Sequence, residues 1–141
     1  MSETQPRETT EWIALYGSLM RGLGEMDEIG LGDRLGFHGP AVIPGALFDL
    51  GDYPGLRRHK LGRVQGELYR ILDAGVLAEL DHFEGVLQNR PTESLYLRER
   101  AQLLEPAGTE AWFYLYNRVP APEKRVAGGD WRGYLETRKR T

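Results

Sequence analysis

Five short strand-like runs, separated by turns rich in glycine and proline, constrain the fold of this chain more than any other sequence feature. They occupy residues 12–16, 41–50, 63–71, 95–104 and 110–117. Within residues 63–71, Val64, Gly66 and Leu68 alternate with polar or aromatic neighbours, which is the period of a half-buried strand. Hairpin-like connections without regular strand–helix alternation predict an α+β domain that is mainly antiparallel, with a sheet curling toward a barrel.

One firm helix is expected between the third and fourth runs. Asp73 offers an N-cap, apolar residues recur at helical spacing from Val76 to Phe83, and Gly85 supplies a stop. Glycines make residues 22–39 ambiguous, with no more than a weak helix, and a short polar helix is expected at the end of the chain. Residues 51–55, Gly-Asp-Tyr-Pro-Gly, predict a turn.

The chain has 141 residues, a length that fits one domain with its own core. Residues 1–10 are polar and aperiodic, so we expect a disordered leader there and a single domain over residues 11–141. The chain contains no cysteine, which excludes disulfides and thiolate metal sites. With no signal peptide or long apolar stretch in the sequence, these features predict a cytoplasmic protein without a membrane partner.

The charge pattern argues against a nucleic-acid partner. The formal net charge is −3, and the one dense basic run, residues 138–140, is interpreted as a solvated tail. The three histidines share no metal-ligand spacing, so no metal site is expected. The sequence leaves the oligomeric state open.

The loop Tyr-Gly-Ser-Leu at residues 16–19 directly follows an apolar run and is a candidate anion site. Backbone N–H groups of such a loop can hold a carboxylate without any cationic side chain. A nucleophilic Ser18 is disfavoured, because Tyr16 and Met20 stand where a nucleophile elbow has glycines. An ordinary strand-to-loop turn remains the alternative.

Glu84 is the candidate general acid and base. The negative end of the helix dipole and burial beside Phe83 would both raise its pKa toward neutrality. Asp81, three residues earlier, could form an acid–base pair with it, and the alternative is a solvated acidic face. Tyr53 and Tyr96 are candidate pocket hydroxyls, because they stand at a turn and at a strand entrance.

An ordered set of motifs resembles the γ-glutamylcyclotransferase-like family, also called AIG2-like, over about residues 12–134. The motifs are Tyr16-Gly17-Ser18-Leu19 with Arg21-Gly22, Gly51-Asp52-Tyr53-Pro54-Gly55, Val64-Gln65-Gly66-Glu67-Leu68-Tyr69, Leu80-Asp81-His82-Phe83-Glu84-Gly85, Tyr96-Leu97-Arg98 and Gly129-Asp130-Trp131. The loop variant is most similar to the γ-glutamylamine and bacterial AIG2-like branches. The resemblance implies a small antiparallel β-barrel flanked by helices, with the loop on one wall of a cavity.

The resemblance also implies an activity, that of a γ-glutamyl cyclotransferase. Such an enzyme releases 5-oxoproline and a free amine or amino acid from a small γ-glutamyl amide, without cofactor or metal. Gly17, Ser18 and Leu19 would bind the substrate α-carboxylate, Tyr16 would fix the loop, and Glu84 would be the acid and base. Tyr53 and Tyr96 would complete the substrate-binding set.

Two other classes of function stay open at this level. A non-catalytic protein that binds a small carboxylate would keep the same loop, and a structural or protein-interaction domain would have no small-ligand pocket. If the chain is an enzyme, we expect the leaving amine to contact residues between the motifs, around 24–36 and 88–94. The leaving amine itself is not encoded in a recognisable motif.

Overall fold

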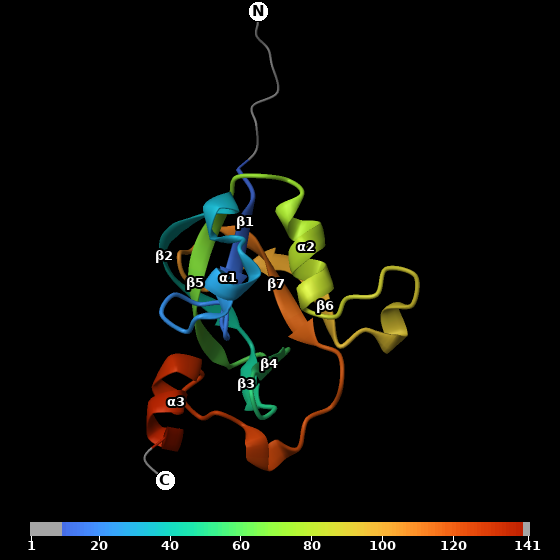
Figure 1. The fold of residues 1–141 in the computed structure, drawn as a ribbon. Helices are drawn as coiled ribbons and strands as arrows, with labels where there is room; N and C mark the ends of the chain where they lie inside the picture. The colour runs from blue at the N-terminus through green and yellow to red at the C-terminus, as the bar shows by residue number, and fades with distance from the viewer. Residues whose placement is uncertain (1–9, 140–141) are drawn as a thin grey trace, which may run out of the picture.

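The computed structural model describes residues 10–139 and has an α+β fold built on a five-stranded sheet (Figure 1). The strand order is β2-β5-β1-β7-β6, and every neighbouring pair is antiparallel except β1 and β7. The bounds are β1 Trp12–Leu15, β2 Leu35–Pro44, β5 Arg63–Ile71, β6 Tyr96–Gln102 and β7 Glu110–Tyr116. A second sheet pairs β3 Ala46–Asp49 with β4 Pro54–Arg57. These pairings confirm the α+β class and the mainly antiparallel arrangement.

The expected barrel is not confirmed, because the sheet is open. Strands β2 and β6 are its edges, and within residues 10–139 an isolated bridge between Val42 and Glu105 links β2 to the loop after β6. There the Val42 N–H donates to the Glu105 carbonyl over 2.8 Å. The strand run predicted at residues 41–50 is divided at Gly45, where a φ of +152° lets the chain pass from β2 into the second sheet.

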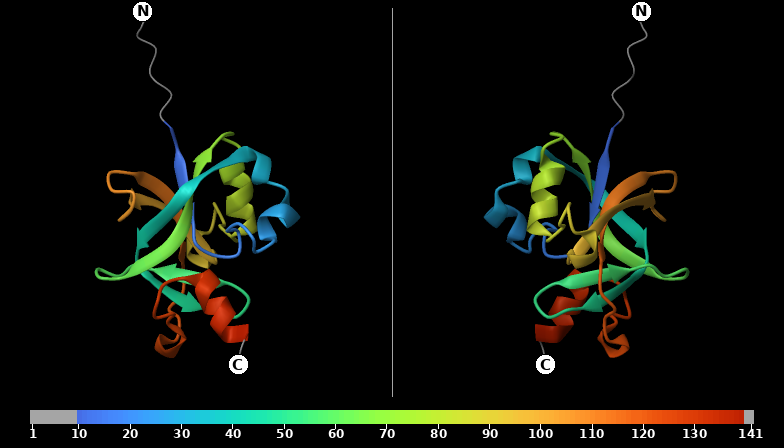
Figure 2. Two further views of the ribbon diagram at one scale, coloured as in Figure 1. Left: turned by 90° about the vertical axis from the view of Figure 1, so that its left-hand side faces the viewer. Right: turned by 90° about the vertical axis from the view of Figure 1, so that its right-hand side faces the viewer.

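Three α-helices accompany the sheets, namely α1 Glu25–Ile29, α2 Val76–Phe83 and α3 Trp131–Lys139. Short 3₁₀ turns occupy Gly32–Arg34, Pro91–Glu93 and Pro122–Lys124. Helices α1 and α2 lie on one side of the curled sheet, while α3 lies beside the β3–β4 hairpin (Figure 2). Helix α2 begins later than predicted, because Asp73 Oδ1 accepts the Gly75 N–H over 2.9 Å and caps the preceding turn instead.

Strand β1 is buried on both faces, which explains its continuous apolar sequence. Ile13 and Leu15 pack into a cluster that includes Leu80 of α2. Ala14, on the opposite face, packs into a second cluster that includes Trp131 of α3. Because β1 lies between the two clusters, the loop that follows it is held by rigid elements on both sides.

The predictions for the two ends of the chain have different outcomes. The leader predicted over residues 1–10 lies almost wholly outside the described residues and stays a prediction. The solvated tail predicted at residues 138–140 is wrong for Arg138, whose Nη1 donates to the Gly51 carbonyl over 2.6 Å and to Asp49 Oδ1 over 3.2 Å. Among the described residues, no helix is long and apolar enough to cross a membrane.

Candidate functional site

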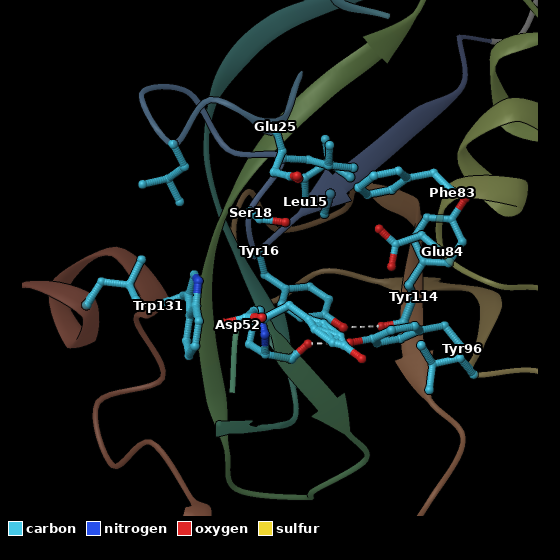
Figure 3. Close-up of a pocket in the computed structure, with 18 of the residues that line it drawn as sticks. Leu15, Tyr16, Ser18, Glu25, Asp52, Phe83, Glu84, Tyr96, Tyr114 and Trp131 are labelled. Carbon is cyan, nitrogen blue, oxygen red and sulfur yellow. Dashed lines mark hydrogen bonds between the residues drawn. The ribbon is translucent and has the colours of Figure 1, made fainter. Parts of the chain in front are cut away.

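A cavity of about 740 Å³ lies where strand β1, the turn before β4 and the end of α2 meet (Figure 3). Seven of the residues that the sequence analysis proposed for the site line this cavity, namely Tyr16, Gly17, Ser18, Leu19, Tyr53, Glu84 and Tyr96, whereas Asp81 does not. The fold therefore brings together segments that are far apart in the sequence. Their roles in binding and catalysis stay predictions. The local geometry shows which hydrogen-bond donors, acceptors and ionisable groups these residues bring to the cavity.

The loop after β1 offers unpaired backbone donors. Its turn is closed by the Met20 N–H, which donates to the Gly17 carbonyl over 3.0 Å. Within residues 10–139, the N–H groups of Gly17, Ser18 and Leu19 have no hydrogen-bond acceptor. A Cβ at Gly17 would lie 3.0 Å from the Cγ and Cδ atoms of Pro54, so the loop packs closely against the start of β4. Consecutive free N–H groups of this kind are suited to an anion.

Tyr16 fixes the start of this loop through two hydrogen bonds of its hydroxyl group. Its hydroxyl donates to the Tyr114 carbonyl over 2.7 Å and accepts the Leu56 N–H over 3.2 Å. Burial raises the pKa of Tyr16 well above its ordinary value, and negative charge at Tyr96 and Glu84 adds to the rise. The hydroxyl therefore keeps its proton, and with it the bond that ties β1 to β7.

The other two tyrosines of the predicted site form an aromatic wall. The ring centroids of Tyr53 and Tyr96 lie 6.3 Å apart. The Tyr96 hydroxyl donates to the Pro54 carbonyl over 2.5 Å. Tyr96 therefore lines the cavity, as expected, while its hydroxyl proton is bonded to the backbone of Pro54.

Glu84 directly follows α2, and its N–H donates to the Leu80 carbonyl over 2.8 Å. Its side chain points into the cavity, toward the wall that Tyr16 and Ser18 form (Figure 3). Burial raises the pKa of Glu84 to about 7, and the negative charges of Glu25 and Asp81 add to this rise. Within residues 10–139 the carboxylate has no hydrogen-bond or ion-pair partner. A carboxyl group of this kind can take up and release a proton near neutral pH.

Asp81 is not the acid–base partner that its spacing from Glu84 suggested. Its side chain is buried and accepts from Arg98 Nε over 2.7 Å and from Arg98 Nη2 over 3.0 Å. The Tyr114 hydroxyl donates to Asp81 Oδ1 over 2.7 Å. These bonds occupy both carboxylate oxygens, so Asp81 is an anchor between α2 and the sheet.

The cavity also has lining residues that the sequence analysis did not assign to the site, chiefly Asp52, Phe83, Tyr114, Trp131 and Leu135. Trp131 forms the wall across from Glu84 (Figure 3). Of the two segments expected to contact the leaving amine, residues 24–36 contribute Glu25, and residues 88–94 contribute no lining residue. The turn motif at residues 51–55 could have indicated Asp52, whereas Trp131 is brought in by α3 from the far end of the chain.

Comparisons with known proteins agree with one another. Residues 13–133 match the protein family described as "Gamma-glutamyl cyclotransferase, AIG2-like". The chain is 36% identical over 119 residues to "Gamma-glutamylcyclotransferase family protein YtfP" of Escherichia coli strain K12, covering 84% of this chain and 94% of YtfP. The solution NMR structure of E. coli ytfP matches with a TM-score of 0.60 and 34% identity, over 85% of this chain and 95% of that one. An AIG2-like protein from Mus musculus shares the fold, with a TM-score of 0.62, 24% identity and 83% coverage of each chain.

Proposed function

This chain belongs to the AIG2-like γ-glutamyl cyclotransferase family, and we propose that it releases 5-oxoproline from a small γ-glutamyl amide. One observation carries the proposal: Glu84 and the loop at residues 16–19 line the same cavity. The loop supplies free N–H groups for the substrate α-carboxylate. Glu84 supplies a carboxyl group that can exchange a proton near neutral pH.

The proposed reaction needs no nucleophilic side chain, because the substrate carries its own nucleophile. The α-amine attacks the γ-carbonyl carbon, a new C–N bond closes a five-membered lactam, and the C–N bond to the leaving amine breaks. Holding an amine and a carbonyl in reacting geometry is worth an effective concentration of about 10⁵ M or more. The main tasks of the protein are then to fold the substrate and to move protons.

Glu84 would move those protons. It would take a proton from the substrate α-ammonium, which frees the amine for attack, and pass a proton to the departing nitrogen. The ammonium loses two protons on becoming the lactam N–H, and the leaving group gains two on departing as an ammonium, so Glu84 ends the cycle unchanged. Acid–base help of this kind is typically worth about 10²- to 10⁴-fold in rate.

The loop at residues 16–19 would make the attack reproducible. If Gly17, Ser18 and Leu19 hold the α-carboxylate through their N–H groups, the α-carbon and its amine are fixed at one end of the cavity. The Tyr16 hydroxyl, bonded to the backbone of β7 and β4, keeps this end rigid. Such a cradle accounts for substrate binding in a cavity that no lysine or arginine side chain lines among the described residues.

The test is mass-spectrometric detection of 5-oxoproline after incubation with γ-glutamyl amino acids, γ-glutamyl amines and glutathione. We expect the wild type to release 5-oxoproline from at least one compound, and Glu84→Gln to release it about 100-fold more slowly or not at all. Glu123→Gln, at an exposed site outside the cavity, is the matched control and should keep wild-type activity. Full activity of Glu84→Gln would remove Glu84 from the proposed role.

The same panel separates cyclotransfer from the non-catalytic alternative, since a shared fold does not by itself deliver a reaction. A binding protein would release no 5-oxoproline from any compound, and yet a γ-glutamyl compound or 5-oxoproline would raise its melting temperature. A structural domain would show neither product nor thermal shift. Either pattern, obtained with folded protein, would contradict the proposed reaction for the compounds in the panel.

A further inference from the structure

Asp81 stands one helical turn before Glu84 and is bonded far more firmly than its neighbours on α2. The residue is 4% exposed. Arg98 of β6 donates hydrogen bonds to its carboxylate from both Nε and Nη2. The Arg98 guanidinium also lies 4.3 Å from the Trp112 ring centroid. The Tyr114 hydroxyl of β7 donates to Asp81 Oδ1 over 2.7 Å, and Gln88 Nε2 donates to Oδ2 over 3.4 Å. Three elements, α2, β6 and β7, therefore meet at this one carboxylate.

The contacts continue from Asp81 to the loop at residues 16–19. Tyr114 donates its hydroxyl to Asp81, and the backbone carbonyl of the same residue accepts the Tyr16 hydroxyl over 2.7 Å. Tyr16 in turn accepts the Leu56 N–H. Two hydrogen bonds, both made by Tyr114, therefore connect Asp81 on α2 to Tyr16, the first residue of the loop.

We propose that Asp81 is a positioning residue for Glu84: it fixes the end of α2 relative to the loop at residues 16–19 and places an ion-paired carboxylate one helical turn from Glu84. This inference rests on the proposed function, because it gives Glu84 a partner in proton transfer. It can be tested independently of that function, because the titration midpoint of Glu84 can be measured in a protein that turns over no substrate.

The electrostatic consequence has a definite sign. The groups that face Glu84 are Glu25 on α1, Asp81 on α2, and three tyrosines, namely Tyr16 directly after β1, Tyr96 on β6 and Tyr114 on β7. Arg98 stands behind Asp81. Removing the Asp81 charge lowers the pKa of Glu84, and the Arg98 cation left without its partner acts in the same direction.

The experiment compares wild type with Asp81→Asn by ¹³C NMR titration of the Glu84 carboxyl carbon, assigned from the signal that is lost in Glu84→Gln. Glu67→Gln is the matched control, because Glu67 is also 4% exposed and also ion-paired, with Arg21 and Arg132. Glu67 is not among the charged groups that raise the pKa of Glu84. Both substitutions therefore remove a buried, ion-paired carboxylate, but only Asp81→Asn removes one that lies next to Glu84.

We expect Asp81→Asn to move the Glu84 titration midpoint about one pH unit toward acid, and Glu67→Gln to leave it in place. The acidic limb of the kcat/KM profile for 5-oxoproline formation should shift with the midpoint. If Asp81→Asn does not fold, Arg98→Gln tests the same interaction from the other side. It removes the cation that pairs with Asp81, so the Asp81 carboxylate acts more strongly on Glu84 and the midpoint should move toward alkaline pH.

The outcomes keep the two proposals apart. A Glu84 midpoint that stays at its wild-type value in folded Asp81→Asn or Arg98→Gln overturns the inference, whatever the enzymatic activity. A midpoint that moves as expected, in a protein that forms no 5-oxoproline from any compound, supports the link between Asp81 and Glu84 and contradicts the proposed function. A midpoint that moves equally in Glu67→Gln shows a general effect of lost packing and also overturns the inference.

Discussion

Replacing Glu84 with glutamine should make the folded protein more stable at alkaline pH, because the site holds an ionisable group where its charge is unfavourable. Burial raises the folded-state pKa of Glu84 to about 7, against 4.5 in its reference state. Below about pH 4.5 the group is neutral in both folded and unfolded chains, and the stability that comes with the raised pKa is fully present. That stability is lost as the pH rises through 7, where the folded protein must ionise a carboxyl that is half-buried in the cavity.

The magnitude follows from the same two values. Each pKa unit corresponds to about 1.4 kcal/mol, so the separation between 4.5 and about 7 corresponds to about 3 kcal/mol at pH 8. Glutamine is neutral at every pH and keeps the size of the side chain. Glu84→Gln should therefore match the wild type near pH 4.5 and exceed its unfolding free energy by about 3 kcal/mol at pH 8.

Urea denaturation followed by circular dichroism, repeated from pH 5 to pH 8, measures this difference. Glu123→Gln, at an exposed position on the loop before α3, is the control for removing a glutamate charge, and its difference from wild type should stay flat with pH. A Glu84→Gln protein no more stable than the wild type at pH 8 would refute the electrostatic reasoning. So would a difference that is equally large at pH 5.

Two further substitutions test the loop and the strand that supports it. Ser18→Ala should change the KM for a γ-glutamyl substrate less than about threefold, because the proposed contacts are backbone N–H groups; a loss as severe as that of Glu84→Gln would assign the binding to the hydroxyl. Gly66→Ala should destabilise the fold by about 2 kcal/mol or more in urea denaturation, because its Cβ would lie 2.7 Å from the Leu15 carbonyl oxygen. Gly39→Ala, whose Cβ would meet no atom within 4 Å, is its control, and an equal loss in both variants would contradict the packing argument.

The elements that could be predicted from the sequence are those whose pattern is local. Strand β5 was predicted with its observed bounds, Arg63–Ile71, because Val64, Gly66 and Leu68 alternate along it and all three are buried on one face of the sheet. Helix α2 was predicted from its 3.6-residue period, and its stop at Gly85 agrees with a φ of +77°. The loop at residues 16–19 and Glu84 were candidates on residue pattern alone, and the resemblance to known family motifs then implied a specific role for each.

Other elements depend on contacts that no local pattern shows. Strand β4 was missed because Pro54 and Gly55 are typical of a turn, yet a Cβ at Gly55 would lie 2.8 Å from Tyr116 Cβ. Glycine is present there because β4 approaches β7 closely. The two bonds of Tyr114, to Asp81 and to Tyr16, become visible only when α2, β7 and the loop after β1 are assembled.

The most direct test of the central claim is to follow the reaction in H₂¹⁸O with a substrate that carries ¹⁵N in its α-amine. Intramolecular attack predicts 5-oxoproline that retains ¹⁵N and contains no ¹⁸O, together with an unlabelled leaving amine. Glutamate that contains ¹⁸O would mean that water, and not the substrate amine, attacks the γ-carbonyl. That result would contradict cyclotransfer, even though Glu84 and the loop at residues 16–19 line one cavity.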